Sequence, residues 1–155
     1  MFSAPQRLTS QDNLDDFMCD VTKIDTWFSK YAMRASKRGT AVVYITRDEQ
    51  GDVAGFYTLS AHSMDRNAVT GWLARNAPDQ IPVILLGMLA VSTNHAHEGL
   101  ETQLLLDAYH RARNAAETIG AKALVVDPID ASVEGFYTRH GFEHVPGSNR
   151  LYARF

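Results

Sequence analysis

The chain has 155 residues, of which 45% are hydrophobic and 21% are charged, and its formal net charge is −3. This composition is typical of a globular protein and excludes a wholly disordered chain. The length predicts one domain over residues 1–155 with a sizeable hydrophobic core. The single cysteine, Cys19, excludes an internal disulfide and a cysteine-rich zinc site. The small negative charge provides no general attraction to nucleic acid.

No segment of the sequence has the pattern of a membrane or export signal. The longest apolar run, residues 81–91, is too short to span a bilayer. The first residues, MFSAPQRLTSQDN, lack the apolar stretch and cleavage site of a signal peptide. Together with the single cysteine, these features predict a cytoplasmic protein that does not enter a membrane.

The N-terminal half begins with a predicted helix over about residues 22–37. Its apolar residues recur at helical spacing: Ile24, Trp27, Phe28, Tyr31 and Ala35. We expect Asp20 or Thr22 to cap its start and Gly39 to end it after a basic last turn. Residues 41–46 and 53–59 then read as two antiparallel strands joined by a polar turn. A short helix is possible within residues 62–80.

The central segment predicts a strand–helix–strand unit. Residues 82–91 are apolar on both faces, as in a buried central strand, and Gly87 inside them indicates a bulge or a close backbone approach. A polar loop over 92–98 leads to a predicted helix over 99–119. Gly120 ends this helix, and residues 123–126 form another buried strand parallel to the first. The apolar stripe of the helix contains Leu100, Leu104, Ala108, Ala112, Ala115 and Ile119.

The C-terminal segment completes an α/β fold. A short helix is expected over residues 133–140, and residues 142–145 and 150–155 are expected to pair as a hairpin. The loop over 92–98 lies where a strand meets a helix N-terminus, and such a place attracts anions because unpaired amides and the helix dipole point at it. Every crossover of this type shares that geometry, so the loop alone identifies no ligand.

Several segments together form a recognisable pattern: Leu86-Gly-Met-Leu-Ala-Val91, Gly99-Leu100, Leu104-Leu-Leu-Asp-Ala108, Ile119-Gly-Ala121 and Phe136-Tyr-Thr-Arg-His-Gly-Phe142. In this order they resemble the GCN5-related N-acetyltransferase superfamily, and within it the toxins that are encoded beside ribbon-helix-helix antitoxins and acetylate aminoacyl-tRNA. Cys19, Ile24-Asp-Thr-Trp27 and Gly55-Phe-Tyr-Thr-Leu-Ser60 also fit. The resemblance covers about residues 15–155. It implies a mixed sheet of about six or seven strands with a splayed parallel pair, and about four helices.

The resemblance also implies a site for acetyl-CoA. Main-chain groups of Leu89, Ala90 and Val91 would bind the pantetheine arm and polarise the thioester carbonyl. Amides of the phosphate loop would hold the pyrophosphate, and its residues are His97, Glu98, Gly99, Leu100 and Glu101. Tyr137 would be the general acid that protonates the departing thiolate, while an amine attacks the thioester directly.

The phosphate loop departs from the family pattern, Gln/Arg-x-x-Gly-x-Gly/Ala. Ala96 stands where a side-chain donor is usual, and Glu101 stands where a small residue is usual. Glu98 and Glu101 both oppose a pyrophosphate, whereas His95 and His97 can add positive charge, mostly below neutral pH. Met88 replaces an arginine that is common in the toxins and reads as an apolar filler. These changes are compatible with a working cofactor site or with a damaged one.

A basic stripe marks the first predicted helix. Its five cations fall within an arc of about 100°, and they are Lys23, Lys30, Arg34, Lys37 and Arg38. Clustered charge of this kind suits phosphate contacts with tRNA. The alternative is a solvated helix face paired with the acidic segment over residues 12–20. The scattered histidines show no ligand spacing, so we expect no metal, Cys19 reads as buried filler, and Asp127 reads as a strand terminator.

These observations predict an acetyl-CoA-dependent N-acetyltransferase of the toxin type that acts on aminoacyl-tRNA. The alternative from another class is a pseudo-acetyltransferase with a degraded pyrophosphate loop, which would act by binding an antitoxin or a homologous toxin. A third reading is an N-acetyltransferase for small molecules or proteins. The family resemblance adds a ribbon-helix-helix antitoxin and a homodimer as expected partners.

Overall fold

The computed structural model describes all residues from 1 to 155. Its three α-helices are α1 (Thr22–Arg38), α2 (Leu100–Ile119) and α3 (Ala131–Arg139), and its two 3-10 helices are η1 (Arg66–Ala68) and η2 (Thr93–His95). Its strands are β1 (Gln6–Arg7), β2 (Val42–Arg47), β3 (Val53–Asp65), β4 (Gln80–Val91), β5 (Ala123–Val126), β6 (Glu143–His144) and β7 (Leu151–Arg154). The seven strands form one sheet in the order β1-β2-β3-β4-β5-β7-β6.

The predicted α/β class and mixed sheet are confirmed, whereas the expected number of helices is one too high. Residues 62–80 supply no α-helix, because β3 continues to Asp65 and only the short η1 follows. The chain divides into two compact units, one formed by Met1–Ser60 and Met88–Ala108 and the other by Ala61–Gly87 and Tyr109–Phe155. Three elements, β3, β4 and α2, each contribute residues to both units.

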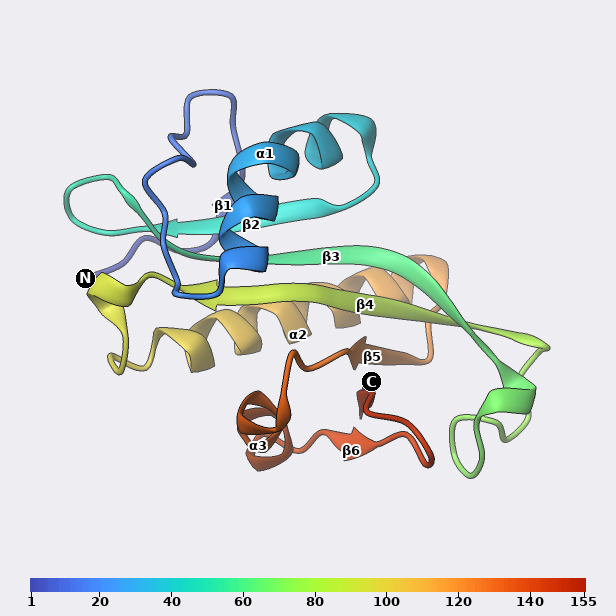
Figure 1. Cartoon of the computed structure of the whole chain (residues 1–155). Coiled ribbons are helices and arrows are strands. Elements are labelled where there is room, and N and C mark those ends of the chain that lie inside the picture. The colour runs from blue at the N-terminus through green and yellow to red at the C-terminus, as the bar shows by residue number, and fades with distance from the viewer. The chain divides into compact units, whose positions relative to one another are not determined.

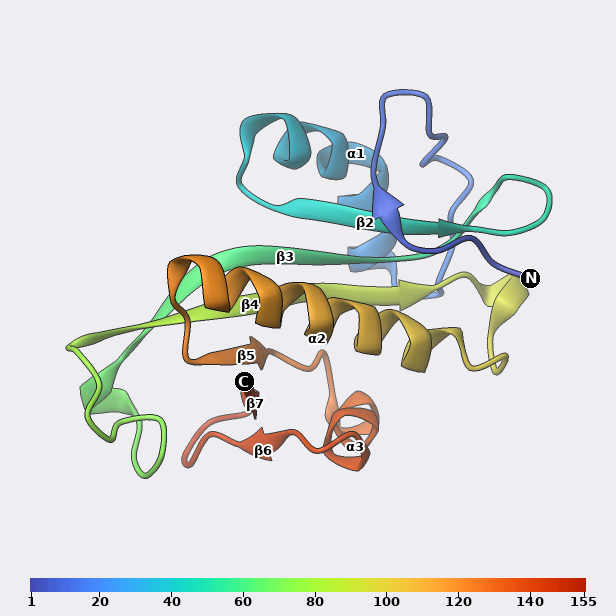
Figure 2. The ribbon, with the colours of Figure 1, turned by 180° about the vertical axis from the view of Figure 1, so that it is seen from behind.

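In the first unit, α1 packs on antiparallel strands. β2 pairs with β1 on one side and with β3 on the other (Figures 1 and 2). The buried face of α1 consists of Ile24, Phe28 and Ala32, which recur every fourth residue. The rings of Phe28 and Phe56 stack with centroids 4.1 Å apart. This apolar layer joins the helix to the strands through the hydrophobic effect.

Two details of α1 differ from the sequence-based expectation. The N-cap is Val21, which has no side-chain acceptor, and the Asp25 carboxylate instead accepts a hydrogen bond from the Cys19 amide at 2.9 Å. Asp20 and Thr22 are therefore not the cap. Tyr31 is 46% exposed, since the helix turns Ala32 rather than Tyr31 toward the strands. The predicted end at Gly39 is confirmed by its left-handed φ of 73°.

Gly55 of β3 allows a close approach inside the first unit. A Cβ at this position would lie 2.9 Å from Cδ1 of Leu104 and 3.0 Å from the carbonyl oxygen of Ala90. Leu104 belongs to the first half of α2 and Ala90 to the end of β4. The absent side chain is what lets this part of α2 and this part of β4 pack on β3.

In the second unit, β4 and β5 form the parallel pair that the sequence predicted. Their register runs from Ile84↔Leu124 to Leu86↔Val126. β5 ends at Val126 and β4 continues to Val91, so their pairing stops before β4 does. The C-terminal hairpin of β6 and β7 is also confirmed, with β7 as the strand that pairs with β5.

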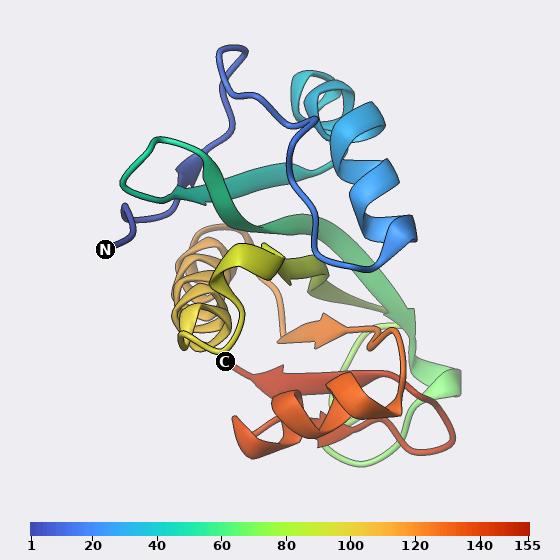
Figure 3. The ribbon, with the colours of Figure 1, turned by 60° about the vertical axis from the view of Figure 1, so that its left-hand side comes forward.

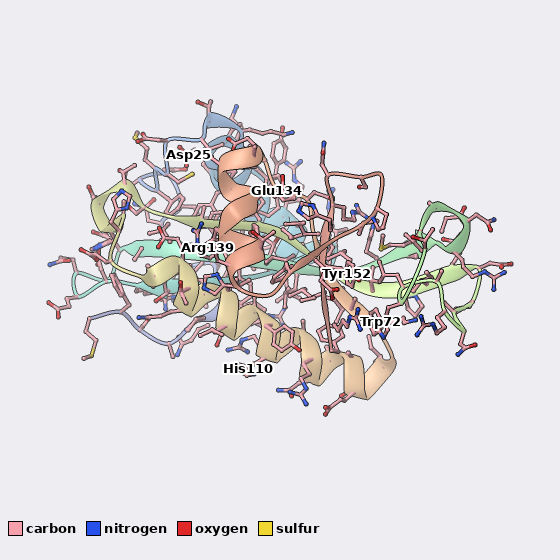
Figure 4. All side chains as sticks on the ribbon, turned by 90° about the horizontal axis from the view of Figure 1, so that it is seen from below. Asp25, Trp72, His110, Glu134, Arg139 and Tyr152 are labelled. Atoms are coloured by element: carbon pink, nitrogen blue, oxygen red, sulfur yellow. The ribbon has the colours of Figure 1, made fainter.

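Stacked aromatic rings join the segment around Trp72 to β7 within the second unit. Trp72 stacks on Tyr152 with centroids 6.0 Å apart and an interplanar angle of 3°, and both are labelled in Figure 4. The Lys122 ammonium lies 4.7 Å from the centroid of the Trp72 ring and donates to the Trp72 carbonyl at 2.6 Å. These contacts combine a cation–π interaction with a charged hydrogen bond.

The helix boundaries are close to the predicted ones. α2 begins at Leu100, one residue after the predicted start, and Gly120 ends it with φ 89°. Its predicted apolar stripe is wrong at the C-terminal end, where Ala115 is exposed and Ile119 is 75% exposed. α3 starts at Ala131 rather than residue 133, because Asp130 caps it by accepting from the amides of Ser132 and Val133.

The surroundings of Gly55 and Gly135 predict opposite changes in the free energy of unfolding when each is replaced by alanine. Gly55→Ala should lower the free energy of unfolding by about 1–3 kcal/mol, because the new methyl group overpacks against Ala90 and Leu104. Gly135→Ala in α3 should instead raise it by about 0.5–1 kcal/mol through helix propensity, since its new methyl group meets only the flexible Arg139 side chain at 3.3 Å. Urea denaturation of both variants tests this, and shifts of the same sign would contradict the packing argument.

Candidate functional site

The loop that follows β4 is ordered by its own hydrogen bonds. The buried Ser92 donates its amide to the carbonyl of Ala54 at 2.8 Å, and its hydroxyl accepts from the Asn94 amide at 3.3 Å. The Ser92 side chain thereby caps η2, a 3-10 turn within the segment predicted as a polar loop. From η2 the chain passes through residues 96–99 into α2 (Figure 3).

The chain before α2 adopts left-handed backbone conformations and leaves open space. His97 and Gly99 adopt left-handed conformations, with φ of 64° and 81°. No heavy atom lies within 4 Å of the position that a Cβ of Gly99 would occupy, so the space beside this backbone is open. The Gln103 amide donates to the Gly99 carbonyl at 3.4 Å. The amides of the first turn give a helix N-terminus its partial positive charge.

A chain of three charged side chains supports this loop. Nδ1 of His95 lies 3.1 Å from the Glu98 carboxylate, and Nε2 lies 3.1 Å from the Asp48 carboxylate in the turn between β2 and β3. The hydrogen bond with Asp48 raises the pKa of His95, opposed by desolvation and supported by Glu98. The pKa of Asp48 is lowered by hydrogen bonds with His95 and with backbone amides, against the effect of desolvation. Glu98, expected to oppose an anion, is therefore paired.

The other departures from the family pattern remain as the sequence shows them. Ala96 is exposed and offers no side-chain donor, and its amide approaches the Thr93 carbonyl at 3.5 Å. Glu101 is half-buried in the first turn of α2, where a carboxylate suits the helix dipole but not a bound phosphate. Main-chain amides, rather than these side chains, are the donors that the loop offers.

The end of β4 presents main-chain groups between alternating side chains. Met88 and Ala90 pack into the apolar core of the first unit, so Met88 is the filler that its side chain suggested. The Met88 amide donates to the Thr58 hydroxyl at 3.1 Å. Leu89 and Val91 are half-buried and point to the opposite face by strand alternation. Their role toward a cofactor stays a prediction.

Tyr137 lies in α3 and belongs to the second unit. It is 3% exposed, and its ring packs against Phe136 and Phe142 with centroids 5.2 and 5.3 Å away. The Tyr137 carbonyl accepts from the amides of His140 and Phe142, which closes the end of the helix. Burial alone raises the pKa of the phenol well above its usual value. The phenol is therefore neutral at neutral pH, and its role as a proton donor stays a prediction.

The five cations predicted as a stripe are all exposed on α1, and we call this surface the α1 basic face: Lys23, Lys30, Arg34, Lys37 and Arg38. The guanidinium of Arg34 lies 5.9 Å from the ring centroid of the exposed Tyr31. In the acidic segment, Asp12 binds Arg47 with an Nε–Oδ1 distance of 3.0 Å, and Asp16 accepts from Asn13. The partners of these two acidic residues therefore lie outside the α1 basic face.

Other reactive side chains are accounted for by their neighbours. Burial, helped by Asp25, raises the pKa of Cys19 to about 11, so its thiol is a poor nucleophile at neutral pH. Asp127 forms a two-pronged ion pair with Arg150, at 2.7 and 2.9 Å, which lowers the pKa of the carboxyl and removes it as a base. Arg150 was not identified from the sequence, because its partner is 23 residues away.

The structure also bears on metal sites and on membrane-spanning helices. No group of three or more His, Cys, Asp or Glu side chains is arranged to hold a metal ion. No helix combines the length and the apolar character that crossing a membrane would require. Asp48 was not identified from the sequence, because it lies 47 residues before its partner His95. The i,i+3 spacing of His95 and Glu98, in contrast, is visible in the sequence.

Comparison with known proteins places the chain in a family. It matches no protein-family model. It is 35% identical over 146 residues to a tRNA-acetylating toxin of Mycobacterium tuberculosis, which covers 94% of this chain and 87% of that protein.

Two solved structures share the fold. AtaT complexed with acetyl-methionyl-tRNAfMet has a TM-score of 0.89 at 22% identity, covering 99% of this chain and 95% of that one. A tyrosine-to-phenylalanine mutant of AtaT, bound to the C-terminus of the antitoxin AtaR and acetyl-CoA, has a TM-score of 0.81 at 21% identity, covering 99% and 92%. With the identity to the mycobacterial protein, the chain belongs to the family of tRNA-acetylating toxins, within the GCN5-related N-acetyltransferase superfamily.

Proposed function

We propose that the protein is an acetyl-CoA-dependent N-acetyltransferase that acetylates the amino group of an aminoacyl-tRNA. The observation that carries the proposal is an open, amide-lined helix start at Gly99 in a chain 35% identical to a tRNA-acetylating toxin. Isothermal calorimetry with acetyl-CoA, followed by an acetyl-transfer assay on aminoacyl-tRNA, tests it. Failure to bind acetyl-CoA would favour the pseudo-acetyltransferase alternative instead.

The residues at the loop fit the phosphate end of acetyl-CoA. The amides of His97, Glu98, Gly99, Leu100 and Glu101 would hold the pyrophosphate, since they lie at or beside the positive end of α2. The open space at Gly99 leaves room for close approach, and His95 offsets the charge of Glu98. Main-chain groups of Leu89, Ala90 and Val91 would hold the pantetheine arm. When bound, acetyl-CoA supplies the activated acetyl thioester.

Tyr137 is assigned the role of general acid, which protonates the thiolate leaving group. Transfer forms an N–C bond to the acceptor amine and breaks the C–S bond, so a thiolate must gain a proton and the amine must lose one. The Tyr137 phenol is neutral at neutral pH and so carries the proton that this role requires. No covalent enzyme intermediate is required, since the amine attacks directly.

The α1 basic face is assigned to tRNA. Its cations are exposed, and Tyr31 beside Arg34 adds an aromatic surface on which a base can stack. The acidic net charge of the whole chain limits this contact to a local footprint. We also propose a cytoplasmic location, which an aminoacyl-tRNA substrate would require. By analogy with AtaT bound to its antitoxin, we also propose an antitoxin as partner. The family resemblance adds the ribbon-helix-helix type of antitoxin and a homodimer to the proposal.

Removal of the Tyr137 hydroxyl tests the acid role. Tyr137→Phe should lower the turnover number by roughly 100-fold, because general-acid catalysis contributes about that much. Acetyl-CoA affinity should change little, since the ring and its packing remain. Steady-state kinetics and calorimetry measure the two quantities. Tyr109→Phe, which removes a hydroxyl that donates to the Arg154 carbonyl, is the matched control. An unchanged turnover number in Tyr137→Phe would remove Tyr137 from the mechanism.

Charge reversal tests the α1 basic face. Replacing Lys30, Arg34 and Lys37 with Glu should abolish tRNA binding and leave acetyl-CoA binding intact. Wild-type binding to tRNA should weaken steeply with salt, because phosphate contacts release counterions. Filter binding at several salt concentrations measures this. The control triple reversal uses the exposed Arg7, Arg75 and Arg113 and carries the same change in net charge. Equal losses in both triple variants would assign the effect to total charge rather than to the α1 basic face.

A further inference from the structure

His95 is placed between two carboxylates that come from different parts of the first unit. Its two ring nitrogens lie 3.1 Å from Asp48 and 3.1 Å from Glu98. A neutral imidazole carries one N–H and can donate to only one of them, whereas the imidazolium donates to both. The arrangement therefore favours a protonated His95 with a carboxylate at each end.

Of the two carboxylates, Asp48 is held more firmly, because backbone amides also bind it. One Asp48 oxygen accepts from the amides of Gln50 and Asp52, both at 3.0 Å, and the other binds His95. The Asp48 side chain is 12% exposed, compared with 49% for Glu98. Phe2 covers the imidazole ring edge-on at a centroid distance of 5.0 Å. The turn between β2 and β3 thus anchors His95, and His95 in turn restrains Glu98.

The restrained carboxylate lies directly before Gly99, at the positive end of α2. A released Glu98 would compete with an anion for the same amides and would repel it. A Glu98 held by an imidazolium does neither, because its charge is compensated and its position is set. His95 thereby supplies positive charge next to a loop whose Ala96 offers no side-chain donor.

We infer that His95 is a positioning residue for acetyl-CoA: anchored by Asp48, it holds Glu98 away from the amides of the α2 start and cancels its charge. This inference rests on the proposed function. His95 need not touch the cofactor, since it acts through Glu98. The same arrangement makes acetyl-CoA affinity depend on the protonation of one histidine.

The sign of this pH dependence follows from the two partners. The charged groups that face His95 are Asp48 from the β2–β3 turn and Glu98 from its own loop, while Phe2 contributes an uncharged ring. Both carboxylates stabilise the imidazolium, so the pKa of His95 is raised. Below the usual histidine pKa the restraint is complete. As pH rises through the raised value, His95 keeps one hydrogen bond, the exposed Glu98 is released, and acetyl-CoA should bind more weakly.

Calorimetry with acetyl-CoA between pH 6 and 9 tests the inference on the full-length protein. His95→Gln should weaken binding at pH 6.5 by about fivefold or more, as expected for an uncompensated like charge near a phosphate. His95→Gln combined with Glu98→Gln should recover most of that loss. The His95→Arg variant should bind acetyl-CoA with an affinity that hardly changes with pH, because arginine stays charged. Any remaining change should come from titration of acetyl-CoA itself. His110→Gln, an exposed histidine of α2 labelled in Figure 4, is the matched control.

Recovery in the double variant separates this role from a purely structural one, because removing a second side chain does not repair a damaged loop. Absence of recovery would overturn the inference. If His95→Gln does not fold, Glu98→Gln alone should flatten the pH dependence above pH 7, and an unchanged slope would overturn it equally. Nitrogen-15 NMR of the His95 ring, without acetyl-CoA, should show both nitrogens mostly protonated at pH 6.5.

The outcomes distinguish this inference from the proposed function. A wild-type protein that binds acetyl-CoA, with His95 variants that bind it equally well, would overturn the role of His95 and leave the proposed function intact. A wild-type protein that does not bind acetyl-CoA would overturn both. A neutral His95 ring at pH 6.5 in the NMR experiment would overturn the role of His95 whatever the calorimetry shows.

Discussion

The close approach at Gly55 is the constraint on which the candidate cofactor loop depends. Because Gly55 has no side chain, Leu104 of α2 and the Ala90 carbonyl of β4 both pack directly on β3. The neighbouring Ala54 carbonyl accepts from the Ser92 amide, where the loop begins. One short stretch of β3 therefore positions both the strand that enters the loop and the helix that leaves it. Tyr57, two residues further along, adds a hydrogen bond from its hydroxyl to the Asp107 carboxylate.

The charges at that loop show that the effect of one residue on anion binding cannot be inferred from its type alone. A glutamate at a helix start stabilises the helix, yet it opposes a phosphate at the same amides. In this protein, His95 resolves the conflict locally for Glu98, because it lies between Glu98 and the anchored Asp48. Glu101 has no such compensation among the contacts described above. The site thus differs from the family pattern in its side chains and offers main-chain amides at the start of α2.

Burial and exposure divide the remaining candidate residues between chemistry and recognition. Tyr137 is buried among aromatic rings, and the cost of forming a phenolate there keeps its proton in place. The α1 basic face is exposed, so its cations remain hydrated and free to meet phosphates. The protein carries a net negative charge, so the proposed contact with tRNA is a local one on this helix.

The sequence alone determined the features that depend on neighbours along the chain. Apolar spacing identified α1 and α2, the left-handed glycines Gly39 and Gly120 marked their ends, and apolar runs identified β4 and β5. Local motifs also indicated the family. Only the tertiary structure decided which residues meet across long separations: Asp48 with His95, Asp127 with Arg150, and β5 with β7. It also decided that Ala32 rather than Tyr31 is buried. The physical reason is that periodicity and turn preferences are short-range properties, whereas charge pairing and burial depend on the packing of the whole chain.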